Sequence, residues 1–191
     1  LALCWLVGPA LAAPLEAEPP VALTSPSAML VEAGTGTVIF EKNADERRQA
    51  ASVTKLMTLL ICFEELEAGN LHLDDSVTVS QEAAAQIGSQ ALLDAGAVYA
   101  LEELLHATIV ASANDAASVI ASDVSDGDLT AFVARMNQRA KELGCTSTSF
   151  TCVHGLYDYG NVSSAHDLAL IAKACAENET YMQVANTLSY T

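Results

Sequence analysis

Two short runs rich in apolar and β-branched residues lie between Ser27 and Lys42, on either side of a Gly34-Thr35-Gly36 turn. Two such runs around a glycine-containing turn are typical of a β-hairpin. From Ala51 onward the apolar positions recur at helical spacing instead. This spacing and its capping residues predict helices over 53–68, 81–87, 101–110, 115–124, 129–143 and 165–177. A two-stranded hairpin is marginal by itself, so we expect further strands beside it, encoded after Thr191.

The first twelve residues, LALCWLVGPALA, are apolar and end in small residues of the A-x-A type. This pattern is typical of the apolar region and cleavage site of a secretory signal peptide, and it is too short for a permanent membrane span. Prolines recur through 13–26, which favours an extended linker. The expected organisation is a signal peptide (1–12) whose start lies upstream, a linker (13–26) and one domain (27–191) of an exported protein.

Composition narrows the range of partners. With 24 acidic and 8 basic residues the chain has a net charge of −16, which argues against nucleic acid because phosphate binding is driven by Lys and Arg. The four histidines lack the spacing of a zinc motif, and the chain has no glycine-rich phosphate loop, so we expect neither a metal nor a cofactor. Free thiols are favoured at Cys62, Cys145, Cys152 and Cys175, with a disulfide between Cys145 and Cys152 left open.

The stretch A51-S-V-T-K-L-M-T places Ser52 and Lys55 three residues apart at the start of an apolar helix. Residues at i and i+3 share one helical face, so the hydroxyl and the amine can meet. A serine becomes a good nucleophile when a neighbouring base takes its proton. A lysine can be that base when desolvation or a positive helix N-terminus lowers its pKa. The alternative is a capping serine followed by a surface lysine whose stem covers apolar neighbours.

A second motif, Ser112-Ala113-Asn114, is predicted in the turn between two helices. A second hydroxyl and a carboxamide at this position can relay a proton and hold a substrate, although both residue types are also common helix caps. The order S-x-x-K, followed about sixty residues later by S-x-N, is the signature of penicillin-binding proteins and serine β-lactamases, which K-T-G completes.

On these motifs the chain resembles the D-alanyl-D-alanine carboxypeptidase family of low-molecular-mass penicillin-binding proteins, from about Ser27 to Thr191. Further blocks carry the resemblance: A-M-L-V-E-A-G-T-G-T-V-I-F-E-K-N, L-E-E-L-L, H-G-L and S-S-A-H-D-L-A-L-I-A-K. The resemblance implies an α/β fold, a mainly antiparallel sheet flanked by helices, of which this chain would hold the hairpin and the helical part. It also implies a place in the periplasm or at the outer face of the cytoplasmic membrane.

The resemblance implies a role for each motif residue. Ser52 would be the acylated nucleophile that attacks the penultimate D-alanine of a peptidoglycan stem peptide, with Lys55 as its general base. Ser112 would relay a proton to the departing D-alanine, and Asn114 would hold the substrate amide and help to orient Lys55. The backbone N–H of Ser52 would form half of the oxyanion hole. Because penicillin mimics the D-Ala-D-Ala end, β-lactams would acylate the same serine.

The K-T-G motif is absent, since Lys42, Lys141 and Lys173 are followed by Asn, Glu and Ala. The resemblance persists to the last residues, so we expect this motif, and any membrane anchor, to follow Thr191. The domain would then be truncated here, and we expect the 191-residue piece alone not to turn over substrate.

Two other functions stay open. A non-catalytic exported peptidoglycan-binding protein on the same fold would lack the downstream K-T-G. A class A β-lactamase is disfavoured, because none of Glu142, Glu177 and Glu179 has Asn four residues later and Ala113 replaces the Asp of S-D-N. Among peptidases of this family, carboxypeptidase and endopeptidase action both fit the sequence.

Overall fold

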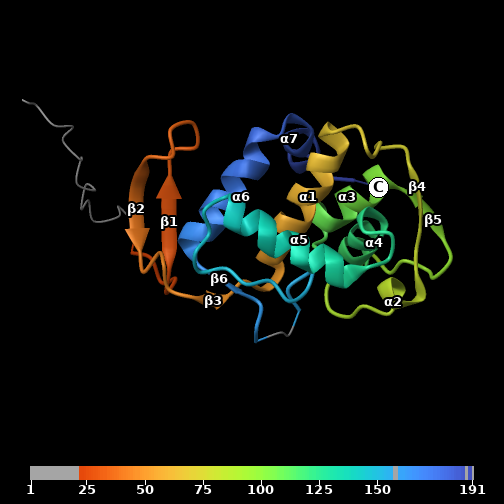
Figure 1. The fold of residues 1–191 in the computed structure, drawn as a ribbon, viewed down its shortest axis with the longest axis horizontal. Helices are drawn as coiled ribbons and strands as arrows, with labels where there is room; N and C mark the ends of the chain where they lie inside the picture. The colour runs from red at the N-terminus through yellow and green to blue at the C-terminus, as the bar shows by residue number, and fades with distance from the viewer. Residues whose placement is uncertain (1–21, 157–158, 188, 191) are drawn as a thin grey trace, which may run out of the picture.

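The hairpin predicted near the start of the domain is formed by β1 (Ala28–Val31) and β2 (Val38–Lys42), which pair antiparallel. Its loop is held by the carboxylate of Glu32, which accepts hydrogen bonds from the backbone N–H groups of Gly34 (2.9 Å) and Thr35 (2.6 Å). In this computed structural model, which describes residues 22–156, 159–187 and 189–190, the hairpin stands at one end of the molecule with β1 against the helix α6 (Figure 1). The predicted signal peptide and most of the predicted linker lie outside the described residues.

The rest of the described chain is largely helical, as the apolar spacing predicts. A 3₁₀ turn, η1 (Ala51–Thr54), precedes the helices α1 (Lys55–Glu67), α2 (Gln81–Ala84), α3 (Leu101–Val110), α4 (Asn114–Val124), α5 (Leu129–Glu142), α6 (Ala165–Glu177) and α7 (Glu179–Ala185). The side chains of Ser80, Asp128 and Ser164 cap α2, α5 and α6, which confirms three predicted helix starts. The helix α2 ends three residues earlier than predicted, and α7 is a helix that the sequence pattern did not indicate.

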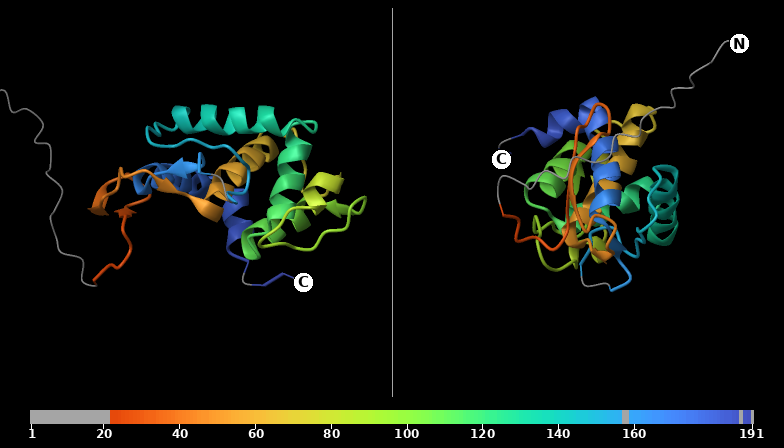
Figure 2. Two further views of the ribbon diagram at one scale, coloured as in Figure 1. Left: turned by 90° about the horizontal axis from the view of Figure 1, so that it is seen from below. Right: turned by 90° about the vertical axis from the view of Figure 1, so that its left-hand side faces the viewer.

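The central element of the helical block is α1, which runs through its middle with α5 along one side (Figure 2). Its side chains from Met57 to Phe63 are buried on all faces. One face joins a core with α3 and α4 through Leu59 and Phe63, and the other joins Phe132 and Ile171 of α5 and α6. A helix that is apolar all round belongs in a core. The middle of α1 is therefore held by close packing on all sides.

Two short strand pairs connect the helices. The strand β3 (Arg48–Gln49) pairs with β6 (Val162–Ser163), and β4 (Ser76–Thr78) pairs with β5 (Val98–Ala100), both antiparallel. The first pair ties the segment before α1 to the loop that precedes α6. These strands have two or three residues each, too few for a period of two to be recognised in the sequence. Together with the hairpin they give the helical block its expected α/β character.

The capping box predicted at Ser164 is only half formed. Its hydroxyl accepts from Asp167 N (3.1 Å), but the Asp167 carboxylate accepts from Thr146 N (3.2 Å), Ser147 N (2.7 Å) and Thr148 Oγ1 (2.7 Å). The carboxylate therefore binds the loop after α5 and does not return to its own helix. The cysteines of the described chain are free thiols, as the sequence favours. They are Cys62, Cys145, Cys152 and Cys175.

Candidate active site

Ser52 lies in the 3₁₀ turn that leads into α1, and Lys55 is the first residue of that helix. Side chains at i and i+3 eclipse one another in a 3₁₀ turn, so this geometry brings the two together more closely than a regular α-helix does. Lys55 Nζ lies 3.3 Å from Ser52 Oγ. The serine is exposed, whereas the lysine is only 3% exposed. The pair therefore presents a hydroxyl to solvent above a buried amine.

The Lys55 amine has three hydrogen-bond acceptors, which come from three separate segments of the chain. Nζ donates to Ser52 Oγ, to Ser112 Oγ at 3.4 Å and to the backbone carbonyl of His154 at 3.2 Å. Burial lowers the pKa of Lys55 to about 8, while the nearby Cys152 acts in the opposite direction. A carboxylate would hold the amine charged, but none is among these three partners. The lysine can consequently release its proton near neutral pH.

Ser112 reaches Lys55 because of an unusual backbone conformation. The residue lies between α3 and α4 with a φ of 54°, in the left-handed region that few residues other than glycine adopt. Such a conformation costs about 1–3 kcal/mol and persists only where the surroundings enforce it. The sharp turn points the second motif at the first, across 57 residues of sequence.

Asn114, the first residue of α4, holds the loop over this turn. Its Nδ2 donates to Ile87 O (2.6 Å) and its backbone N–H donates to Ser89 O (2.7 Å). Gly88 has a φ of 88°, and a side chain there would come within 2.9 Å of the Asn114 amide nitrogen. The Asn114 Oδ1 is buried and has no hydrogen-bond partner among the described residues. The predicted contact between Asn114 and Lys55 is not among the hydrogen bonds of the described residues. The third acceptor of the Lys55 amine, after the two serine hydroxyls, is the carbonyl of His154.

The next residue, Asp115, fastens the same loop more firmly. Its carboxylate is fully buried and accepts from the backbone N–H groups of Ala91 (3.0 Å) and Leu93 (3.1 Å). A buried carboxylate that accepts several N–H groups stabilises the loop strongly. The second motif is thus anchored through two successive residues at the start of α4.

Residues 151–156 and 159–161 close the site from the other side, and none of them was predicted as a site residue. Asn161 Nδ2 donates to Thr54 Oγ1 (2.6 Å), and Thr58 Oγ1 donates to Val153 O (2.6 Å). Gly155 approaches so closely that a Cβ there would lie 1.8 Å from the carbonyl oxygen of Ala51. The H-G-L block of the family resemblance was a signal for this loop, but it did not indicate which atoms touch α1.

Two cavities meet at Ser52. One, of about 380 Å³, is lined by Ser52 together with Gly155 and Asn161. The other, of about 360 Å³, is lined by Ser52, Lys55 and Ser112. Both volumes lie within the range of small-ligand pockets. A substrate laid across the serine can therefore extend to either side.

The histidines are not arranged for metal binding. Within the described ranges no group of three or more His, Cys, Asp or Glu side chains could hold a metal ion. His106 is buried, and the centre of its ring lies 3.9 Å from that of Tyr190 in a stacked arrangement. His154 lies beside the site, and burial together with the Lys55 charge lowers its pKa. The imidazole next to the lysine is therefore neutral at physiological pH.

Known proteins are similar to this chain in both sequence and fold. A family model described as D-alanyl-D-alanine carboxypeptidase matches residues 13–190. The chain is 40% identical over 161 residues to the D-alanyl-D-alanine carboxypeptidase DacF of Bacillus subtilis, which covers 84% of this chain and 41% of the relative. It is 39% identical over 153 residues to DacC of Escherichia coli, covering 76% of this chain and 38% of that protein. The chain thus spans about two fifths of the length of these curated relatives.

Solved structures agree with the sequence matches. Penicillin-binding protein 5 of Haemophilus influenzae superposes with a TM-score of 0.85 at 28% identity, over 92% of this chain and 52% of that one. The D-alanyl-D-alanine carboxypeptidase DacD of Francisella tularensis gives a TM-score of 0.83 at 36% identity, over 86% of this chain and 40% of that one. These matches confirm the α/β fold predicted from the resemblance. Together they show that the chain belongs to the D-alanyl-D-alanine carboxypeptidase family.

Proposed function

We propose that this chain carries the nucleophile half of a serine-type D-Ala-D-Ala carboxypeptidase, which removes the terminal D-alanine from peptidoglycan stem peptides and is acylated by β-lactams. The observation that supports this most directly is the position of Lys55. Its amine is buried, its pKa is lowered to about 8, and it lies within 3.4 Å of two serine hydroxyls. A base with a pKa near the working pH is best suited to accept and return a proton.

In the proposed acylation, neutral Lys55 takes the proton of Ser52 Oγ while this oxygen attacks the carbonyl carbon of the penultimate D-alanine. The oxyanion accepts a hydrogen bond from the Ser52 backbone N–H. The C–N bond then breaks, and the terminal D-alanine nitrogen receives a proton through Ser112, which contacts the lysine amine. Water completes the cycle by hydrolysing the ester, with Lys55 again accepting a proton.

Asn114 is the proposed substrate contact. Its Oδ1 is buried without a partner in the described chain, while its Nδ2 is occupied by Ile87 O. A buried acceptor of this kind is stabilised by a donor. The peptide N–H of a stem peptide bound beside Ser112 would supply one. We further propose that substrate-carboxylate binding comes from a K-T-G segment encoded after Thr191, and that the protein acts outside the cytoplasmic membrane after export. Among the described residues, none of the helices has the length and apolarity of a bilayer span.

The test is release of D-alanine from a stem peptide ending in D-Ala-D-Ala, measured on the full-length gene product. We expect activity in the wild type and its loss in Ser52→Ala and Lys55→Met, at unchanged far-UV circular dichroism. General-base removal alone lowers rates by about 10²–10⁴. A folded protein that binds peptidoglycan without releasing D-alanine would favour the non-catalytic alternative. Cleavage of cross-linked dimers without release from monomers would indicate an endopeptidase.

A further inference from the structure

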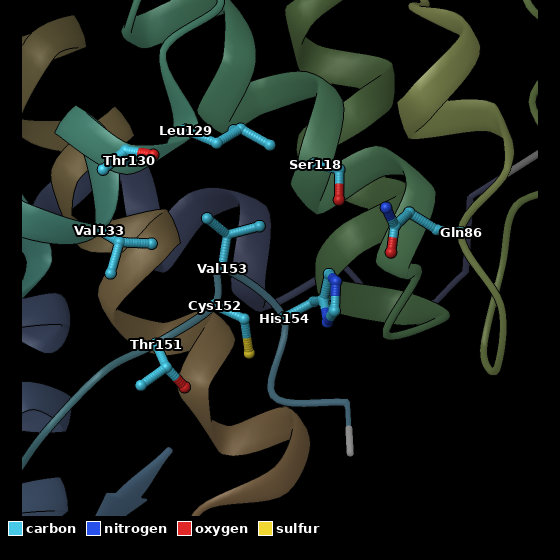
Figure 3. A pocket seen from close by; sticks show the side chains of 9 residues that line it. All are labelled: Gln86, Ser118, Leu129, Thr130, Val133, Thr151, Cys152, Val153 and His154. Atoms are coloured by element: carbon cyan, nitrogen blue, oxygen red, sulfur yellow. The ribbon is translucent and has the colours of Figure 1, made fainter. Parts of the chain in front are cut away.

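A third cavity, of about 290 Å³, is lined by the loop that carries His154 and not by Ser52 (Figure 3). Ser118 of α4 and Gln86 stand at one end of it, and Thr151 stands at the other, with Cys152 and His154 between them (Figure 3). Its volume is at the small end of the range for ligand pockets, so it suits a small molecule.

Ser118 gives this cavity an unused polar group. The side chain is 2% exposed, and its Oγ has no hydrogen-bond partner anywhere in the described part of the chain. Figure 3 shows the hydroxyl directed into the space between Gln86 and His154. A buried hydroxyl without a partner is destabilising, whereas a ligand hydroxyl or amide placed opposite would satisfy it. The cavity therefore favours a ligand with one hydrogen-bonding group at this end.

Cys152 gives the same cavity a reactive group. It is partly exposed, lines the cavity, and its Sγ accepts a hydrogen bond from Gly155 N at 3.2 Å. The other three cysteines of the described residues are buried, and burial raises the pKa of Cys62 and of Cys175 to about 12 and that of Cys145 to about 11. Thiolate is the reactive form of cysteine, so these three are poor nucleophiles. Cys152 is the accessible thiol that remains.

We propose that this cavity is a modification site, at which Cys152 reacts with small disulfides that carry a hydroxyl group and Ser118 binds that hydroxyl. The Cys152 thiolate attacks one sulfur of the disulfide, a new S–S bond forms, and the original S–S bond breaks. The Cys152 sulfur is oxidised to a mixed disulfide, and the departing half leaves as a thiolate that takes up a proton from water. Excess thiol reverses the step.

The adduct would act on the active site through one loop. Lys55 Nζ donates to the carbonyl of His154, two residues from the modified sulfur, and Gly155 packs against Ala51. A group added to Cys152 on the cavity side displaces this loop and loosens the third contact of the lysine. We expect a lower rate of Ser52 acylation in the modified protein. This consequence rests on the proposed function, but formation of the adduct does not.

The test compares bis(2-hydroxyethyl) disulfide with diethyl disulfide, which has the same carbon chains on sulfur and lacks the hydroxyls, on the folded full-length protein. Intact-mass measurement and peptide mapping should give a single adduct on Cys152, absent in Cys152→Ser and removed by excess thiol. The hydroxylated reagent should react faster than its apolar match by about fivefold, the effect of one hydrogen bond. Ser118→Ala should abolish this preference while it leaves reaction with diethyl disulfide unchanged.

Three results would overturn the proposal: no adduct on the folded protein, adducts on Cys62, Cys145 or Cys175 at a similar rate, or equal reagent preference in wild type and Ser118→Ala. Penicillin acylation is then measured before and after modification. If the adduct forms with the expected preference but neither form is acylated, the modification site stands and the proposed function fails.

Discussion

Gly155 offers the sharpest mutational test of how the nucleophile is positioned. Its φ is 84°, and a Cβ added there would lie 1.8 Å from the carbonyl oxygen of Ala51 and 2.8 Å from Thr54 Oγ1. Both atoms belong to the segment that carries Ser52. Because ordinary contacts begin at 3.4 Å, Gly155→Ala must move either the loop or the start of α1 by more than about 1 Å, since close-packed interiors leave no slack.

The expected magnitudes follow from this geometry. A left-handed conformation costs a non-glycine residue about 1–2 kcal/mol, and overpacking adds about 1–3 kcal/mol. A displacement of about 1 Å at a catalytic group can lower the rate about 100-fold. We therefore expect Gly155→Ala to reduce the free energy of unfolding by about 2–5 kcal/mol and to slow acylation of Ser52 by about 100-fold.

The matched control is Gly144→Ala, after the end of α5. Gly144 has a similar, left-handed φ of 88°, but a Cβ there meets nothing within 4 Å. It should lose only the backbone contribution, about 1–2 kcal/mol, and keep the wild-type acylation rate. Denaturant titration and stopped-flow acylation by a labelled penicillin measure both quantities on the full-length product. If Gly155→Ala acylates as fast as Gly144→Ala, the contact with Ala51 does not position Ser52.

Three further predictions concern the surroundings of the site. Acylation should rise with pH and level off above about 8, the pKa of Lys55. This folded-state pKa lies below the ordinary value of 10.5, so between pH 8 and 10.5 the unfolded chain binds more protons than the folded chain. The free energy of unfolding should therefore rise with pH over this range, and Lys55→Met should remove that rise. Asn161→Ala removes the donor to Thr54 Oγ1 and should lower the free energy of unfolding by about 1–3 kcal/mol in denaturant titration; an unchanged midpoint would show that this bond contributes nothing. Asp115→Ala removes the buried acceptor of the Ala91 and Leu93 N–H groups and should lower the free energy of unfolding by about 3 kcal/mol, whereas exposed Asp94→Ala should change it by less than about 0.5 kcal/mol. Equal effects would show that the Asp115 carboxylate does not hold the loop.

The features that the sequence predicts well are local. The approach of Ser52 to Lys55 depends on three residues of backbone, and the caps at Ser80 and Asp128 depend on one turn each. In each case neighbouring residues determine the geometry, so spacing is sufficient. The hairpin follows for the same reason.

The features that the sequence does not predict are long-range or lack a side-chain signature. The third partner of Lys55 is the backbone carbonyl of His154, 99 residues away, and any residue type could supply it. The capping box at Ser164 fails because the Asp167 carboxylate binds distant N–H groups. The left-handed turn at Ser112 is enforced by packing and not by residue preference.

The proposed function depends on acylation of Ser52 with Lys55 as its base. To test this step, the full-length product is incubated with a labelled penicillin at pH 8 and the adduct is located by peptide mass spectrometry. We predict one slowly hydrolysed adduct on Ser52, lost in Ser52→Ala and strongly slowed in Lys55→Met. A folded protein that forms no adduct, or an adduct on another residue, would contradict it.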